Sequence, residues 1–518
     1  MSLSRRGFLR ASLTLGIPSL SGCVANSLPI QSNTFPRLQN QPTPSALGLA
    51  TSLPYEYHYE TKIEGKIPND LRGVLYRNGP GLFDKNGLRK RFLLDGDGMI
   101  QAFRFHDKGV SFQNKFVRTQ KFIEESLADK FLYSTWTTQA PGGVMSNIFG
   151  HNMMNQAGVN VIRRGNTLYA NDESSQPYAL NPDTLQTIGL SNLGVSTEQP
   201  IVYSAHWKVD GKNGDWVHFG SDYGKGLNIH LTIFDKSGKL KRHWIFPSPR
   251  YVYMHDFFVT ERYIILNLHP SFMSIYGFLL GKESIVDSIS WEPEKGNLIM
   301  VIDKTGEQEP WSLTVEASWM WHSLNAYEKG NEIIADFVAS DNANELVGKN
   351  TRFRAIMSAQ RGEARAPQNI RRYIINIKKK TIKQEVLGEG DYEFPMVNSS
   401  HSCHPHKYGY FVKKTNDEFF WENVVRMDMN SGAIESFGFG AGYYCTEPIF
   451  ATKPGVHYDV SKNEEPGWAL TEVYDGHTHK TFLAVFNAEH IADGPIAKIH
   501  LDHHVPISFH GSWYQNTP

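Results

Sequence analysis

Short apolar segments of about four to eight residues recur along most of this chain, separated by Gly, Asn or Asp turns. Val, Ile, Tyr and Phe dominate these segments, a composition typical of β-strands. Three segments share one pattern, an apolar run followed by Asp or Asn, a turn and Gly: IFDKSGKL, VIDKTGE and MDMNSGAI. This pattern is typical of the outer hairpin of a propeller blade, although the repeats have diverged too far to give a regular period.

An all-β fold is therefore expected, and two architectures can bury so many short strands. A β-propeller holds them in one domain without long exposed edges. Two stacked sandwiches are the alternative. Residues 123–133 and 271–285 are expected to be helical or loop-like. Such segments would cap one face of a propeller, where functional sites usually lie.

The first 23 residues resemble an export signal. A basic stretch, SRRGFLR, precedes an apolar run of about ten residues, which is half of what a membrane-spanning helix needs. The paired arginines resemble a twin-arginine signal. The sequence LSGC, which ends at Cys23, resembles the lipobox of bacterial lipoproteins. We therefore expect residues 1–23 to be a signal peptide and Cys23 to carry lipid; a disordered basic tail is the alternative.

The stretch that follows, residues 24–52, is polar and Pro-rich and predicts a flexible tether. Residues 53–518 are long enough for one large propeller domain. The formal net charge is −1 and no long charge block occurs, which argues against a nucleic-acid partner. Only Cys403 and Cys445 follow the signal, so a disulfide-rich framework is excluded, while pairing of these two stays open.

The chain has 21 histidines but no HExxH and no paired CxxC motif. The cluster HSCHPH at residues 401–406 is irregularly spaced and contains Pro, so we interpret it as a surface loop rather than a metal site. The sequence DGDG at residues 95–98 lacks the third acidic position of an EF-hand loop, because Met99 stands there. It predicts a tight turn.

Four other histidines stand singly in apolar, strand-like surroundings. They are His206 in YSAHWKVD, His255 in YVYMHDFF, His322 in MWHSLNAYE and His510 in ISFHGSW. Spacing alone favours a core or turn histidine at each position, because separations of 49, 67 and 188 residues match no local metal motif. In a propeller, however, ligands that come from different blades and meet on one axis would show such separations.

The surroundings of these histidines resemble the carotenoid cleavage oxygenase family, which includes carotenoid-, apocarotenoid- and stilbene-cleaving dioxygenases and the retinal pigment epithelial membrane protein. The resemblance runs from about residue 54 to Trp513, with its landmarks in the family's order. They include EGKIPNDLRGVLYRNGPGLF, LLDGDGMIQAFRF, DESSQPYALNPDTLQT, SAHWKVD, MHDFFVTERYIIL, SWEPEKGNLIMV, WHSLNAYE, YEFPMVN, TEPIFATKPG and FHGSW. A single landmark is weak evidence, but ten in order are strong evidence.

The resemblance implies a seven-bladed β-propeller with a cap of loops and short helices over one face, and one Fe(II) ion per chain on its axis. The residues that match the family's metal site are His206, His255, His322 and His510 as ligands, with Glu173, Glu393 and Glu447 behind the last three. Neutral imidazole binds Fe(II) well. A ligating histidine usually donates its other ring N–H to a carboxylate, which fixes the tautomer and the ring orientation.

The implied activity is cleavage of a C=C double bond by O₂ to give two carbonyl products from an extended, apolar polyene or aryl alkene. Stilbene-cleaving relatives carry a Lys shortly before the strand that corresponds to VNVIRRGNTLYA, where this chain has Met153. A carotenoid or apocarotenoid substrate is therefore favoured over a phenolic stilbene. Two alternatives stay open: an isomerase, hydrolase or stilbene-cleaving member of the same family, and a non-catalytic, membrane-tethered propeller that binds an apolar ligand or a protein.

Export and anchoring fit this activity. The twin-arginine route moves folded proteins, which suits a chain that must first fold around iron. A lipid anchor would hold the protein at a membrane surface, where carotenoid-like substrates dissolve. The apolar run Phe272–Leu280 is expected to add a surface patch at the tunnel mouth, or else to form a buried cap helix. Val24 after the lipid-bearing Cys favours the periplasmic face of the outer membrane, and a monomer is expected.

Overall fold

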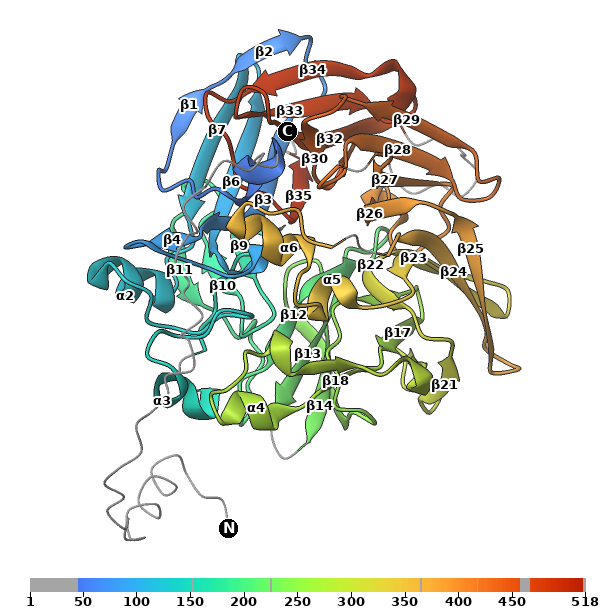
Figure 1. Cartoon of the computed structure of the whole chain (residues 1–518). Helices are drawn as coiled ribbons and strands as arrows, with labels where there is room; N and C mark the ends of the chain where they lie inside the picture. The colour runs from blue at the N-terminus through green and yellow to red at the C-terminus, as the bar shows by residue number, and fades with distance from the viewer. Residues whose placement is uncertain are drawn as a thin grey trace, which may run out of the picture. The chain divides into compact units, whose positions relative to one another are not determined.

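Seven antiparallel sheets follow one another around a ring, and each is a blade of a β-propeller (Figure 1). The computed structural model describes residues 45–150, 153–223, 226–363, 366–416, 418–456 and 466–515. Within these residues the chain is all-β with a few short helices, and it forms a seven-bladed propeller as expected. The predicted signal peptide, residues 1–23, lies outside the described residues.

The first four blades have these strands, in sheet order. Blade 1 contains β1 (His58–Glu60), β7 (Gly109–Phe116), β6 (Asp97–His106), β3 (Gly73–Leu82) and β35 (His510–Gln515). Blade 2 contains β11 (Thr187–Leu190), β10 (Tyr178–Leu180), β9 (Thr167–Asn171) and β8 (Asn160–Arg164). Blade 3 contains β12 (Val202–Val209), β13 (Trp216–Tyr223), β14 (Leu227–Phe234) and β15 (Leu240–Pro247). Blade 4 contains β16 (Phe257–Val259), β17 (Tyr263–Leu268), β20 (Asn297–Asp303) and β21 (Trp311–Val315).

The remaining blades complete the ring. Blade 5 contains β22 (Trp319–Lys329), β23 (Glu332–Ser340), β24 (Asn369–Asn376) and β25 (Thr381–Gly388). Blade 6 contains β26 (Asp391–Met396), β27 (Tyr408–Lys414), β28 (Asn423–Asp428) and β29 (Ile434–Gly438). Blade 7 contains β2 (Lys62–Gly65), β34 (Pro495–His500), β33 (Lys480–Asn487), β32 (Gly467–Asp475) and β30 (Tyr443–Cys445), with β31 (Ile449–Thr452) also paired to β32.

Strands from both ends of the described chain share two blades and so close the ring. In blade 1 the C-terminal β35 pairs with β3, where His510 lies opposite Asn78. In blade 7 the early strand β2 pairs with β34. Figure 1 shows the blue and red ends of the colour range meeting there. This closure also carries His510 to the centre of the ring.

Burial along the strands follows their distance from the axis. The inner strands of the blades lie around the axis, and several that belong to neighbouring blades contact one another, such as β16 with β22 and β22 with β26. Strands inside a blade are packed on both faces and are therefore almost continuously apolar: YIILNL in β17 is buried throughout. Outermost strands such as β11, β25 and β29 alternate between exposed and covered residues, because only one face packs on a neighbour.

Short helices and two small hairpins connect the blades, and several lie in front of the ring in Figure 1. The α-helices are α2 (Gln120–Ala128), α3 (Val144–Asn147), α4 (Ile275–Leu279), α5 (Asn344–Val347) and α6 (Arg352–Ala355). The 3₁₀ helices are η1 (Ser45–Ala50), η2 (Leu93–Asp95), η3 (Ile148–Gly150), η4 (Val286–Ser288), η5 (Pro293–Lys295), η6 (Ile356–Ser358), η7 (Ser399–His401) and η8 (Ile491–Asp493). The hairpins pair β4 (Asp84–Lys85) with β5 (Leu88–Arg89), and β18 (Ser271–Met273) with β19 (Ile289–Trp291).

Several local expectations need correction. The tether expected over residues 24–52 overlaps η1, whose Ala46 and Leu49 are buried in the apolar core beside blade 7. The helix expected over residues 123–133 begins earlier, because the Thr119 hydroxyl accepts a hydrogen bond from the Phe122 N–H, and it ends at Ala128. Residues 271–285, expected to be helical or loop-like, contain α4 but also the strand β18.

The two clusters with metal-like spacing also have structural roles. The segment 401–406, expected as a surface loop, is largely buried, since His401, His404 and His406 are each less than a tenth exposed. The His404 ring bonds the Asp210 carboxylate at 3.0 Å. Residues 95–98, expected as a tight turn, are instead the end of η2 at Asp95, a bend at Gly96 and the start of β6. Asp95 accepts hydrogen bonds from the backbone N–H of Thr137 and the hydroxyl group of Thr138.

Cys403 and Cys445 are both buried and do not form a disulfide. Burial raises the pKa of the Cys403 thiol to about 12, so it packs as a neutral side chain. Among the described residues, no helix has both the length and the apolar character to cross a membrane.

Candidate metal centre

Four inner strands bring the four predicted histidines together at the centre of the ring. His206 lies on β12, His322 on β22 and His510 at the start of β35, while His255 lies two residues before β16. Their ring nitrogens, one from each histidine, lie within 4.8 Å of one another, and all four residues are buried. Histidines far apart in the sequence are neighbours because each lies at the inner edge of a different blade.

Irregular pairing near the axis helps to aim these side chains. The register between β12 and β13 shifts between Tyr203 and Trp207, around His206. The register between β22 and β23 shifts on both sides of the segment that carries His322. A bulge bends a strand and redirects a side chain, and bulges often occur beside functional sites. The sequence periodicity alone does not reveal these shifts.

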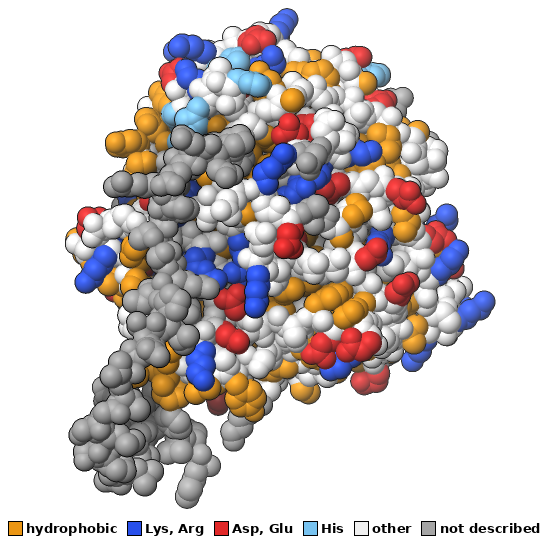
Figure 2. Space-filling view, viewed as in Figure 1, with side chains coloured by type: hydrophobic (Ala, Val, Ile, Leu, Met, Phe, Trp, Pro, Cys, Tyr) orange, Lys and Arg blue, Asp and Glu red, His pale blue; other side chains and the backbone are white. Residues whose placement is uncertain are grey.

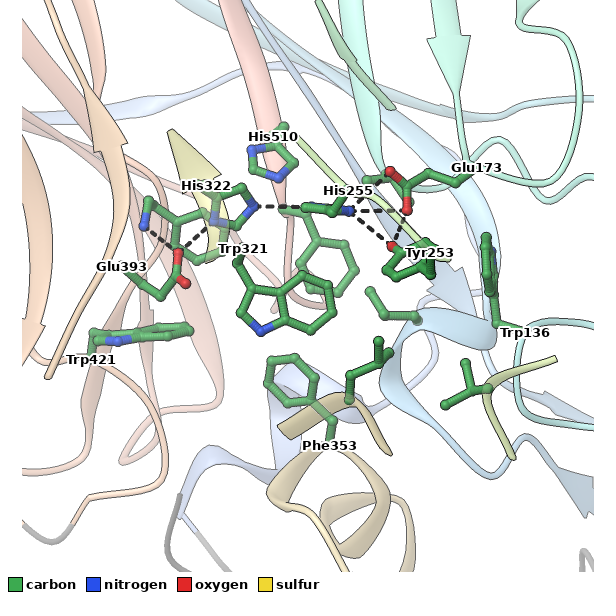
Figure 3. Close-up of a pocket in the computed structure, with 16 residues that line it drawn as sticks. Trp136, Glu173, Tyr253, His255, Trp321, His322, Phe353, Glu393, Trp421 and His510 are labelled. Atoms are coloured by element: carbon green, nitrogen blue, oxygen red, sulfur yellow. Dashed lines mark hydrogen bonds and ion pairs between the residues drawn. The ribbon is translucent and has the colours of Figure 1, made fainter. Parts of the chain in front are cut away.

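Each of three histidines is held from behind by a glutamate, and Figure 3 shows two of these pairs, His255 with Glu173 and His322 with Glu393. The Nδ1 of His255 lies 2.9 Å from Glu173 Oε1, and the Nδ1 of His322 lies 2.5 Å from Glu393 Oε2. The Nδ1 of His510 lies 2.8 Å from Glu447 Oε1. Glu173 follows β9, Glu393 lies on β26, and Glu447 lies between β30 and β31. Because a carboxylate accepts the Nδ1 proton, the Nε2 lone pair of each ring is left facing the centre.

The Nε2 atoms are spaced as if around a cation. His206 Nε2 lies 3.0 Å from His255 Nε2, which lies 3.4 Å from His322 Nε2. An ion about 2.1 Å from both members of either pair would be bound at an ordinary angle of roughly 90–110°. Lone pairs of neutral rings repel at these separations unless a cation lies between them. The donor set therefore fits one metal ion, and neutral imidazoles suit Fe(II).

The formal charges around the centre also fit a divalent ion. Glu173, Glu393 and Glu447 contribute three negative charges, and the buried Arg77 lies between Glu447 and a further buried carboxylate, Glu472. A divalent cation would offset two of the three negative charges behind the histidines. Burial of such a cluster without compensation would be costly.

Other groups, which no sequence motif revealed, hold the glutamates. Arg77 on β3 donates to Glu447 Oε2 at 2.8 Å. The Tyr253 hydroxyl donates to Glu173 Oε2. The Phe394 backbone N–H donates to Glu393 Oε2 at 2.7 Å. Arg77 occurs in the landmark VLYRNGP, where an arginine inside an apolar strand pattern was the available signal.

Electrostatics keep two of the histidines neutral and make a third more basic. Burial, with help from the neighbouring rings, holds the pKa of His206 well below its ordinary value. Burial also lowers the pKa of His510 to about 4, against the opposing effect of Glu447. Burial opposes protonation of His322 too, but the Glu393 carboxylate outweighs it and raises the pKa of that ring. His206 and His510 are thus neutral, metal-ready donors at neutral pH, while a proton on His322 competes with the metal.

An apolar cavity opens beside the centre, under the short helices. Its wall includes Trp136, Trp321, Phe353, Trp421 and Phe509. Figure 3 shows Trp136 and Trp421 on opposite sides of the drawn site, with Phe353 approaching from the cap. Among the lining residues the polar side chains are Tyr253 and the histidines and glutamates of the centre. This cavity can hold an apolar group against the metal centre while excluding water.

Comparisons with known proteins agree with this geometry. The family model described as retinal pigment epithelial membrane protein matches residues 50–515. Apocarotenoid-15,15'-oxygenase from Synechocystis is 31% identical over 477 residues, which cover 90% of this chain and 95% of that protein. Isoeugenol monooxygenase from Pseudomonas nitroreducens is 27% identical, with 88% and 94% covered.

Solved structures show the same fold. A variant of Synechocystis apocarotenoid oxygenase superposes with a TM-score of 0.84 at 30% identity, covering 91% of this chain and 98% of that one. A cobalt-substituted form of the Synechocystis enzyme superposes equally well, with a TM-score of 0.84.

Proposed function

This chain belongs to the retinal pigment epithelial membrane protein family, and from that premise we propose that it is an Fe(II)-dependent dioxygenase that cleaves a C=C double bond of an apocarotenoid or carotenoid. The observation that carries the proposal is the convergence of four buried histidines, three of them backed by glutamates, beside an apolar cavity. One Fe(II) per chain suits this donor set.

The chain's own residues position the metal and the substrate and exclude water; they do not transfer protons. Bound Fe(II) supplies activation of O₂. The glutamates fix the Nδ1–H tautomer of His255, His322 and His510 and so keep each Nε2 aimed at the metal. The aromatic walls hold one double bond of the substrate near the centre and keep water out. Cleavage by O₂ needs no serine or cysteine nucleophile.

The cavity wall favours a polyene over a phenolic substrate. The Tyr253 hydroxyl is already engaged with Glu173, and the remaining polar lining groups are those of the metal centre and the indole N–H groups of the tryptophans, which only donate. A phenol O–H buried there would lose its acceptor in water without a dedicated replacement among the side chains of the wall. The apocarotenoid oxygenase relative is also more similar to this chain than the isoeugenol or lignostilbene enzymes, which are 27% and 24% identical.

The test is product analysis with a substrate panel. Iron-loaded protein is incubated with β-apocarotenals of different lengths, phenolic stilbenes and isoeugenol under ¹⁸O₂. We expect two carbonyl products from the apocarotenals, with labelled oxygen in both products when exchange with water is controlled. Selective turnover of the phenolic compounds would contradict the substrate assignment. If the polyene is recovered isomerised but uncleaved, the protein is an isomerase and not a dioxygenase.

We also propose that the protein docks on a membrane. Exposed apolar side chains gather on α3, η3 and α4, as Figure 2 shows at the lower edge of that view. They are Val144 (47% exposed), Met145 (78%), Phe149 (65%), Tyr276 (78%) and Leu280 (49%). Together they define the α3–α4 patch. Within the expected run Phe272–Leu280, Phe272 and Phe278 are half-buried, so α4 contributes only part of the patch.

The α3–α4 patch is linked to the cavity through a short connection. Val286 on η4, which follows α4, donates its backbone N–H to the Trp136 carbonyl, and both residues line the cavity. The patch therefore lies next to elements of the cavity wall, which supports entry of an apolar substrate from a bilayer on this side. Anchoring through Cys23 after twin-arginine export, at the periplasmic face of the outer membrane, is part of the same proposal.

Vesicle flotation tests the membrane proposal. Met145→Glu with Tyr276→Glu should reduce flotation of the chain, without its first 23 residues, on neutral phospholipid vesicles by at least fivefold. The matched control is Leu127→Glu on α2, a similarly exposed apolar side chain outside the patch. Equal loss in patch and control variants would contradict docking through this patch.

A further inference from the structure

A second pocket adjoins the metal centre and differs in chemistry from the apolar cavity. We call it the axial pocket: it is lined by residues of the inner strands β12, β22, β26 and β35, and of η7. The apolar cavity, in contrast, takes its wall partly from cap elements, including α5 and α6. Both cavities are lined by His322 and His510, so both reach the four-histidine centre.

The axial pocket has a mixed wall, in which a row of polar side chains faces apolar ones such as Leu324, Met396 and Val397. Lys208 Nζ pairs with Asp256 Oδ1 at 2.8 Å, and the other carboxylate oxygen accepts from the Ser323 hydroxyl at 2.8 Å. Ser399 and Ser402 add hydroxyl groups farther along η7 and the loop after it. The volume is about 190 Å³, whereas a single water needs only about 10–15 Å³ on the same kind of measure. The axial pocket therefore has room for several waters with polar partners.

The axial pocket also reaches the surface, because the lining residue Ser399 is exposed and Lys208 is partly exposed. Polar groups thus extend from solvent to His206, His322 and His510 without crossing the aromatic cavity. A hydrated divalent cation can move along such walls while keeping its water shell or exchanging waters for oxygen atoms. In the aromatic cavity it would have to shed water with nothing to replace it until it reached the centre.

We propose that Fe(II) enters and leaves the four-histidine centre through the axial pocket, so that metal exchange and substrate binding use separate routes. The inference rests on the proposed function, in which this centre holds Fe(II). This route gives a role to the polar groups of the axial pocket, which the cleavage reaction does not use.

Metal-exchange kinetics test the proposal. Two variants, Ser399→Trp and Ser402→Trp, place a large side chain in the axial pocket, and Leu94→Trp places one in the apolar cavity. The control is Ser237→Trp, which makes the same Ser-to-Trp change in an exposed turn between β14 and β15. Metal-free full-length protein is mixed with Fe(II) under anaerobic conditions, and free metal is followed with a chromogenic chelator. Release is followed after loading, with excess chelator.

The expected result is at least tenfold slower uptake and release in Ser399→Trp and Ser402→Trp, with an unchanged final content of one iron per chain. Equal slowing in both directions leaves the dissociation constant unaltered, which separates a blocked route from a damaged site. Ser237→Trp and Leu94→Trp should exchange at the wild-type rate, while Leu94→Trp should raise the KM for the polyene.

Three results would overturn the inference. Wild-type exchange rates in Ser399→Trp, which alters an exposed side chain and so does not depend on repacking, would show that the axial pocket is not the route. Slower exchange in Leu94→Trp would assign the route to the apolar cavity. A raised KM for O₂ in the axial-pocket variants, without a change in metal exchange, would assign that pocket to dioxygen. If wild-type protein binds no iron, the proposed function itself fails.

Discussion

Arg77 is predicted to be the main charge that makes the buried carboxylates behind His510 tolerable. Its guanidinium is 1% exposed and donates to Glu447 Oε2 at 2.8 Å. Its Nε also lies 3.6 Å from Glu472 Oε2 and donates to the Ser508 hydroxyl at 3.1 Å. Arg77→Met keeps much of the side-chain volume but removes the charge and every donor. Two buried carboxylates then lose their cationic partner.

The magnitude follows from the burial of the group. Removing one partner of a buried ion pair costs about 3–5 kcal/mol, because the other charge stays uncompensated. We therefore expect Arg77→Met to lower the free energy of unfolding of the metal-free protein by about 3–5 kcal/mol at pH 8. Arg72→Met is the matched control, since Arg72 pairs with the exposed Asp107 at 3.2 Å. Such an exposed pair should contribute only about 0–1 kcal/mol.

The pH dependence separates lost charge from lost packing. Arg77 and His510 hold the pKa of Glu447 low although burial opposes them, while burial raises the pKa of Glu472 despite Arg77. Without Arg77 both folded-state pKa values should rise, so the folded variant takes up protons as the pH falls. The penalty should therefore be larger at pH 8 than at pH 5. Urea unfolding at both pH values measures it, and an equal penalty at the two would refute the charge argument.

Three further predictions concern the metal and the buried histidines. Glu393→Gln removes the carboxylate that accepts a hydrogen bond from His322 Nδ1, and it should weaken Fe(II) binding about 10–100-fold in an anaerobic titration. Glu435→Gln on the outer strand β29 is the control and should leave Fe(II) binding unchanged. Removal of the metal by a chelator should lower the melting temperature, because an ion present at 100 times its dissociation constant adds about 2.7 kcal/mol to the free energy of unfolding. His206→Ala should abolish the difference in melting temperature between iron-loaded and metal-free protein. Burial lowers the pKa of His218 to about 4 in the folded protein. As the pH falls from 6.5 to 4, the unfolded chain therefore binds a proton that the folded protein does not bind, and the free energy of unfolding decreases. His218→Gln should lose about 3 kcal/mol less than wild type between pH 7 and pH 4 in urea unfolding, and an identical loss would show that this ring does not titrate in that way.

Short apolar strands, turn residues and blade-like hairpins are local signals, and they predicted an all-β fold while leaving a propeller and two stacked sandwiches open. The seven-bladed ring followed from the family resemblance. The sequence could not assign blade membership of β2 and β35, since ring closure pairs strands separated by hundreds of residues. Local polarity also misled at residues 401–406. Those histidines looked like loop residues, yet the fold buries them against groups such as Asp210, which lies far away in the sequence.

The metal centre, too, was only partly predictable from the sequence. Spacing alone favoured core histidines at His206 and His255, and only the family resemblance joined the four into one set. Arg77 and Tyr253 were missed because their partners, Glu447 and Glu173, come from other blades. A contact between blades leaves no periodic trace in a single sequence, so the residues that support the centre become visible only in three dimensions.

The most direct test of the central claim is iron content measured together with O₂ consumption on the same preparations. The account predicts one iron per chain and one O₂ consumed per double bond cleaved in wild type. Both should be lost in His255→Ala and kept in His106→Ala, which alters a partly exposed histidine outside the centre. Cleavage that persists in His255→Ala without iron, or iron bound with unchanged stoichiometry in that variant, would contradict the four-histidine centre.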